Sequence, residues 1–67
     1  MTLEQQVLVH RYRYYVMDDP VISDFEYDQL ERQARNLLSL ESPVHGVGSS
    51  LASSYSDEVA TLARSMG

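Results

Sequence analysis

Residues 14–28 read YYVMDDPVISDFEYD, and this run holds the expected end of one helix and the start of another. The Asp19-Pro20 step favours a turn, because the residue before a proline avoids the helical region. Ser23 is a strong helix N-cap, and Glu26 follows it at the spacing of a capping box. The run therefore predicts two helices joined by a short loop.

The expected helices extend outward from this loop over about residues 3–17 and 24–40. Thr2, with Gln5 three positions later, gives a capping-box signature for the first helix. Apolar side chains recur at helical spacing in both segments, which predicts an all-α fold built on an antiparallel helical hairpin. In the first helix these side chains are Leu3, Val7, Leu8, Tyr12, Tyr14 and Tyr15, and in the second they are Tyr27, Leu30, Ala34, Leu37 and Leu38.

The rest of the chain divides into a connector and a third, shorter helix. We expect the hairpin over residues 1–42, a connector rich in Ser, Gly and Pro over 43–56, and a C-terminal segment over 57–67. Ser56 is a suitable cap for a helix over about residues 57–66, where apolar residues again follow helical spacing. This helix could complete a three-helix core, dock onto a partner, or fray.

The composition excludes several kinds of chemistry. The 67 residues carry a net charge of −5 and contain no cysteine, which excludes disulfides and thiolate zinc sites. All the basic residues are arginines, so no lysine within this sequence can form a covalent intermediate. The acidic balance argues against direct DNA binding, and no apolar run is long enough for a membrane span. We expect a soluble, cytoplasmic protein without a metal site.

Five side chains around the turn form the candidate site. Asp24 and Asp28 stand at i and i+4, so both carboxylates share one helical face. Tyrosine faces attract a cation with about 0.5–2 kcal/mol when partly desolvated, and carboxylates accept hydrogen bonds from amides or ribose hydroxyls. Such a site suits a flat, positively charged ring. The five residues are Tyr14, Tyr15, Asp24, Tyr27 and Asp28.

The same side chains also have a simpler interpretation. Tyrosines at helical spacing usually pack in a core or at its rim, and aspartates near a helix start commonly cap the helix and complement its dipole. His10 is expected to be an exposed or half-buried helix residue, and His45 a loop residue. Residue types and spacing leave ligand binding and packing both open.

A resemblance to a known family bears on this choice. The pattern Tyr-Tyr-Val-x-Asp-x-Pro-x-Ile-Ser-Asp-x-Glu-Tyr-Asp-x-Leu, over residues 14–30, closely resembles the N-terminal domain Ia of bacterial NAD-dependent DNA ligases. Residues 42–48, SPVHGVG, are similar to the Ser-Pro-Thr-x-x-Val-Gly connector of that family. Together the similarity covers roughly residues 3–48.

The resemblance implies a role for each candidate residue. The domain would close over the nicotinamide mononucleotide (NMN) half of NAD. Tyr14 and Tyr27 would bracket the nicotinamide ring, and Asp28 would hold its carboxamide. Asp24 and Tyr15 would contact ribose or phosphate, although position 15 is histidine in some family members and tyrosine in others.

The chain also departs from the family pattern. The spacer before residues 42–48 is shorter than usual, and a capped helical pattern follows where the family begins its adenylation domain. The resemblance thus implies an NMN/NAD-recognition module for DNA replication and repair that is inactive alone. Its partner would be a ligase adenylation domain or chain, with the reacting lysine on that separate chain. The alternative is a non-catalytic helical interaction or regulatory module that retains the domain Ia fold and uses the 51–66 stripe.

Overall fold

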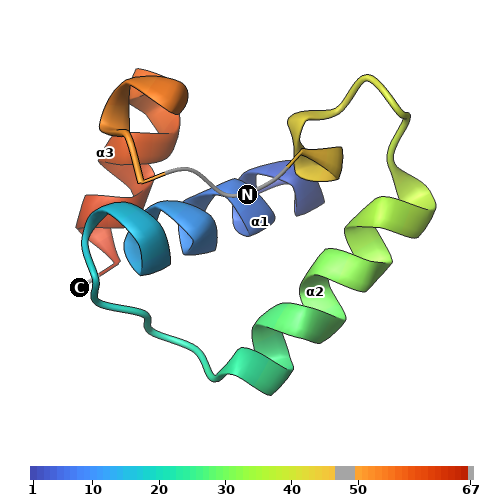
Figure 1. Cartoon of the computed structure of the whole chain (residues 1–67), viewed down its shortest axis with the longest axis horizontal. Coiled ribbons are helices and arrows are strands. Elements are labelled where there is room, and N and C mark those ends of the chain that lie inside the picture. Colours follow the sequence, from blue (N-terminus) through green and yellow to red (C-terminus); the bar gives the residue numbers. More distant parts are fainter. Residues whose placement is uncertain (47–49, 67) are drawn as a thin grey trace.

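The computed structural model describes residues 1–46 and 50–66 and confirms the all-α prediction. Within these residues there are three α-helices with short helical turns between them, and α1 lies between α2 and α3 (Figure 1). Val47 and Gly48, which end the second family-like motif, and Gly67 of the C-terminal segment lie outside the described residues. None of the described helices is long and apolar enough to cross a membrane.

The first helix begins as the sequence predicts and ends in a widened turn. Helix α1 (Leu3–Arg11) has the expected capping box, in which Thr2 Oγ1 accepts from the Gln5 amide at 3.1 Å and Gln5 Oε1 accepts from the Thr2 amide at 3.0 Å. A π-helical turn, η1 (Tyr12–Val16), continues it. Single π turns inside helices often accompany functional sites.

The second helix, α2 (Asp24–Leu37), starts at the predicted cap and stops short of residue 40. Ser23 Oγ accepts from the Glu26 amide at 3.2 Å, and α2 runs back obliquely in the opposite sense to α1 (Figure 1). Leu38 is already extended. The expected packing of Leu37 is wrong: its side chain is 69% exposed, because the stripe that packs on α1 follows positions 27, 30, 34 and 38.

The third helix, α3 (Asp57–Ser65), completes the core. Ser56 Oγ caps it by accepting from the Val59 amide at 3.2 Å. The apolar face of α3 is buried against α1, so of the three expectations for this helix the structure shows the core role. The cluster between α1 and α3 contains the buried residues Val9, Tyr12, Val59 and Ala63.

A second small core lies on the opposite face of α1. Its buried residues are Val7, Ala34 and Val44, with Val44 supplied by the short turn η2 (Pro43–His45). A further turn, η3 (Ala52–Ser54), precedes α3. The connector thus contributes to packing, and α1 is the central element between two small clusters.

Candidate functional site

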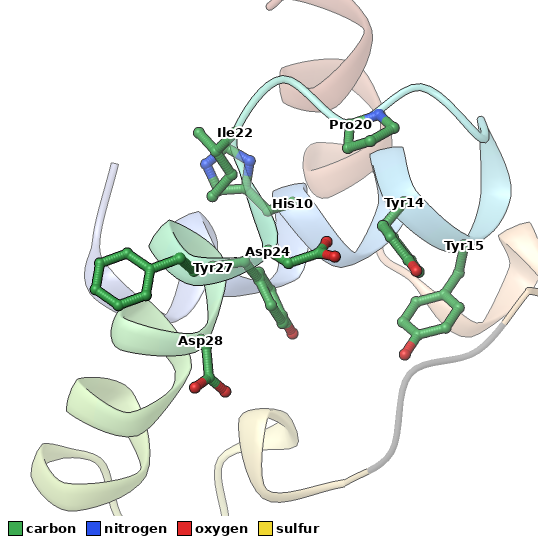
Figure 2. A pocket seen from close by; sticks show the side chains of 9 residues that line it. His10, Tyr14, Tyr15, Pro20, Ile22, Asp24, Tyr27 and Asp28 are labelled. Carbon is green, nitrogen blue, oxygen red and sulfur yellow. The ribbon is translucent and has the colours of Figure 1, made fainter.

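An open pocket of about 450 Å³ lies where the end of the first helix meets the start of the second (Figure 2). Its size is in the range of small-molecule sites. The structure brings all five predicted site residues together around it. The lining consists of His10, Tyr14, Tyr15, Pro20, Ile22, Asp24, Phe25, Tyr27 and Asp28.

Tyr14 and Tyr15 form one wall of the pocket from η1. Their rings meet edge to face, with centroids 5.0 Å apart and planes at 77°. The side chains are 49% and 45% exposed, so both rings lie at the rim and not in either core. In an ordinary α-helix adjacent side chains point about 100° apart. The wider π turn brings the two rings closer in direction, toward the same opening (Figure 2).

Tyr27 forms the opposite wall, and hydrogen bonds to two neighbouring side chains fix its hydroxyl. The Arg11 Nε–H donates to Tyr27 Oη at 2.8 Å, and the hydroxyl hydrogen-bonds in turn with the Glu31 carboxylate. Burial of the half-buried phenol raises the pKa of Tyr27 to about 12. The hydrogen bonds at its hydroxyl hold the Tyr27 ring in a fixed orientation.

Glu31 belongs to the same group of contacts. Its burial alone would raise the pKa, but hydrogen bonds from Tyr27 and Arg35 and the charges of Arg11 and Arg35 lower the pKa below the usual glutamate value. Arg11 Nη2 lies 3.7 Å from the carboxylate and Arg35 Nε lies 2.9 Å from it. Glu31 is thus a stable anion that holds the buried Arg11 guanidinium against Tyr27.

Two carboxylates from α2 also line the pocket. Asp24 begins α2 and Asp28 follows one turn later, and both face the opening (Figure 2). Arg32 Nη2 contacts Asp28 Oδ2 at 3.2 Å, with both side chains largely exposed. An exposed i,i+4 pair of this kind is worth only about 0.3–0.5 kcal/mol. Asp28 can therefore exchange this partner for a ligand at little cost.

His10 is the pocket residue that the sequence argument undervalued. It lies one helical turn before Tyr14, and this spacing could have placed it on the same face. Burial and the Arg13 charge lower the pKa of His10 below its usual value, although the Glu26 charge opposes this shift. Its Nδ1 is buried without a hydrogen-bond partner in the described part of the chain. Pro20, Ile22 and Phe25 were also not predicted to line the site.

The site therefore combines aromatic faces, two carboxylates and a neutral histidine in a partly desolvated opening. This arrangement can hold a flat cationic ring and accept hydrogen bonds from amide or hydroxyl groups. Among residues 1–46 and 50–66, no group of three or more His, Asp or Glu side chains is placed to hold a metal ion.

Comparison with known proteins gives a family match over most of the chain. A family model described as "DNA ligase-like, N-terminal NAD+-binding domain" matches residues 1–48. This span contains α1, η1 and α2 and all nine residues that line the pocket. No solved structure matches the chain.

Several curated proteins named DNA ligase are similar to the same region. The relative from Roseiflexus castenholzii is 48% identical over 54 residues, which cover 70% of this chain and 8% of the ligase. The relative from Thermotoga maritima is 43% identical over 53 residues, covering 69% and 8%. The relative from Hahella chejuensis is 38% identical over 61 residues, covering 81% and 9%. The chain spans less than a tenth of the length of these relatives.

Proposed function

Because the chain belongs to the family of N-terminal NAD+-binding domains of DNA ligases, we propose that its pocket binds the NMN half of NAD+. The observation that carries the proposal is the convergence of Tyr14, Tyr27 and two carboxylates around one opening. Nicotinamide in NAD+ is a flat cation with a carboxamide, and it is attached to a ribose phosphate. Each of these groups has a chemical counterpart in the pocket.

The tyrosine rings recognise the cationic ring. Tyr14 and Tyr27 bracket the nicotinamide from the two walls, and the fixed Tyr27 ring supplies the rigid face. A cation over a tyrosine ring contributes about 0.5–2 kcal/mol when partly desolvated. Because Arg11 holds the Tyr27 hydroxyl at 2.8 Å, little side-chain entropy is lost when the ligand stacks on this ring.

The polar groups set the orientation of the nucleotide. Asp28 accepts from the carboxamide NH2 group after leaving Arg32, while Asp24 and Tyr15 contact the ribose or phosphate. Tyr15 suits the phosphate end, since a phenol O–H can donate where a carboxylate cannot. The acidic pocket favours the cationic ring over the phosphate, so nicotinamide contacts provide most of the affinity.

The mechanism is positioning of a leaving group. A lysine from an adenylation domain or chain attacks the adenylyl phosphorus of NAD+, the bond to the NMN phosphate breaks, and NMN leaves. Residues of this chain hold the nicotinamide nucleotide so that the pyrophosphate is aligned for that attack. In this role the chain is a component of a cytoplasmic DNA ligase of replication and repair, and it does not bind DNA directly.

Titration with NMN tests the proposal. We expect amide resonances of residues 10–28 in the 15N-labelled chain to shift progressively with millimolar NMN. Tyr14→Ala should weaken binding about ten-fold, and Asp28→Asn about five-fold, since each removes one stacking or charge-assisted contact worth about 1 kcal/mol.

The matched control is Glu41→Gln, which removes one carboxylate from an exposed position outside the pocket lining. Its NMN affinity should equal that of the wild type. The proposal fails if saturating NMN shifts no pocket resonance and an NAD-dependent adenylation domain, mixed with the chain, gains no NMN release.

A further inference from the structure

Arg13 is a buried cation whose hydrogen bonds none of the pocket roles uses. Its side chain is 2% exposed and joins two segments that are far apart in sequence. Nη1 donates to the Ala63 carbonyl at 2.7 Å, Nε donates to the Asp19 carbonyl at 3.0 Å, and Nη2 donates to the Asp19 carboxylate at 2.9 Å. One guanidinium thus links the last turn of α3 to the loop between α1 and α2.

The α3 end of this link has a clear physical basis. The carbonyls of the last helical turn lack partners within the helix and carry the negative end of its dipole. At that end the Ala63 carbonyl accepts from the Met66 amide at 3.3 Å and from the positive guanidinium of Arg13 at 2.7 Å. Val59 and Ala63 of α3 are also buried against α1. The C-terminal end of α3 is therefore fixed next to η1.

The other end of the link fixes a strained loop. The Asp19 amide donates to the Arg13 carbonyl at 2.8 Å, so both the backbone and the side chain of Arg13 hold this residue. Asp18 has a φ of 53°, a left-handed conformation that non-glycine residues adopt at an energetic cost. Three side-chain and backbone contacts at Asp19 offset this cost and fix the path of the chain.

The loop and its neighbour carry pocket residues. Pro20 directly follows Asp19, and Tyr14 and Tyr15 directly follow Arg13. Val16 and Met17, which follow the two tyrosines along the chain, pack against the buried cluster that α3 forms with α1 and η1.

We propose that Arg13 is a positioning residue for the nicotinamide pocket, through which α3 holds the Tyr14–Tyr15 wall and the Asp19–Pro20 loop in their binding arrangement. The inference rests on the proposed function, because it assigns a determinant of affinity to the same site. It extends that function to residues 57–65, which lie outside the family-matched span of residues 1–48. Arg13 itself does not line the pocket.

Two variants of the full chain weaken the Arg13 link to different extents. Arg13→Met removes all three side-chain hydrogen bonds, while Asp19→Asn removes only the charge of an acceptor whose side chain is 69% exposed. NMN dissociation constants are measured by NMR at a temperature where each variant is fully folded. We expect the dissociation constant to rise about ten-fold in Arg13→Met and about three-fold in Asp19→Asn. Arg13→Lys, which keeps the charge but not the fork of donors, should recover part of the loss.

The matched control is Arg64→Met. It also removes an arginine from the α3 side, where Arg64 donates to Tyr12 Oη at 3.0 Å, but it touches neither Asp19 nor the pocket. Its NMN affinity should be unchanged although its stability falls. The inference is overturned if folded Arg13→Met and Asp19→Asn bind NMN as tightly as wild type, or if Arg64→Met weakens binding as much as Arg13→Met.

Hydrogen exchange without ligand separates this inference from the proposed function. In Arg13→Met the Asp19 amide should exchange at least ten-fold faster than in Arg64→Met, while amides in the middle of α2 keep their protection. Unchanged exchange at Asp19 overturns the positioning role even if NMN binds. Faster exchange in a chain whose wild type ignores NMN supports the link and refutes only the nicotinamide pocket.

Discussion

The two faces of α1 repeat one design with different consequences. Toward α2, the face has a small core around Val7 and a buried guanidinium at Arg11. Toward α3, it has a small core around Val9 and a buried guanidinium at Arg13. Positions 7 and 11, like positions 9 and 13, are one turn apart, so each face places an arginine beside its valine.

The partners of the two guanidinium groups differ. Arg11 donates to the Tyr27 hydroxyl and to the carbonyls of Pro43 and Val44 from η2, and it faces the Glu31 carboxylate. Arg13 has one carboxylate partner, which is largely exposed, and two carbonyls. The α2 face therefore fixes a ring of the pocket directly, whereas the α3 face acts on the pocket through a loop.

The largest expected effect contrasts the two arginines. Arg11→Met should lower the free energy of unfolding by about 3 kcal/mol, because Glu31, Tyr27 Oη and two carbonyls lose a buried partner. Arg13→Met should cost about 2 kcal/mol, since water can reach the Asp19 carboxylate. Urea unfolding monitored by circular dichroism measures both. Arg32→Met, whose side chain is 77% exposed, should change stability by less than about 0.5 kcal/mol. Equal costs for all three variants would refute the contrast.

The next effect sharpens the comparison by making one cavity on each face. Val7 is 0% exposed and Val59 is 4% exposed, so Val7→Ala and Val59→Ala should each cost about 2 kcal/mol. The two variants should differ in which backbone amides exchange hydrogen faster. In Val59→Ala this should be the Asp19 amide, and in Val7→Ala the amides of Val44 and His45. Hydrogen exchange by NMR reports both. An identical pattern in the two variants would mean that the faces are one cooperative unit.

These local differences also show how far sequence reasoning reaches. Helix starts were predicted correctly at Thr2, Ser23 and Ser56, because a cap is a contact between residues three apart. The meeting of the tyrosines and aspartates was predicted as well, since a short loop must bring two helix ends together. The end of α2 was placed too late, because Leu38 leaves the helix while its side chain still packs in the core.

Tertiary packing decides what the sequence could not show. Arginines are mostly exposed in proteins, and nothing in their spacing says that Arg11 and Arg13 are covered by η2 and α3. The π turn at η1 has no clear sequence signal either, although it gives Tyr14 and Tyr15 their common direction. His10 could have been found from its i,i+4 relation to Tyr14, whereas its unpartnered Nδ1 could not.

A smaller effect tests whether NMN binding depends on the ring of Tyr27 or on its hydroxyl. Tyr27→Phe should cost about 1 kcal/mol of stability, because the Arg11 Nε–H loses its acceptor. NMN affinity should fall by less than about three-fold, since the stacking ring remains. Tyr27→Leu, which keeps an apolar side chain without the ring, should weaken binding about ten-fold. Equal NMN affinities for the Phe and Leu variants would contradict a stacking role.

The smallest expected effect is a pH dependence of stability that arises from His10. Burial, with the Arg13 charge, lowers the pKa of His10 below its usual value of 6.5, against the opposing charge of Glu26. The unfolded chain therefore takes up a proton as the pH falls through about 6.5, while the folded chain does so only at lower pH. Stability should fall over this interval and stop falling once folded His10 is protonated. The lowered pKa of Glu31 affects stability as the pH falls below its usual value of 4.5, so the interval between pH 7 and pH 5.5 reports mainly on His10.

Replacing His10 isolates this contribution. In His10→Asn the loss of stability between pH 7 and pH 5.5, measured by urea unfolding, should be smaller than in the wild type. Arg13→Met removes one of the two causes that lower the pKa, so NMR titration of the imidazole should give a higher His10 pKa in that variant than in the wild type. Arg11→Met should leave the imidazole titration nearly unchanged, because the charge of Arg11 is not among the causes of the shift. A shift of the His10 pKa in both arginine variants would show that the two faces are electrostatically coupled, and the division between a direct and an indirect support of the pocket would then fail.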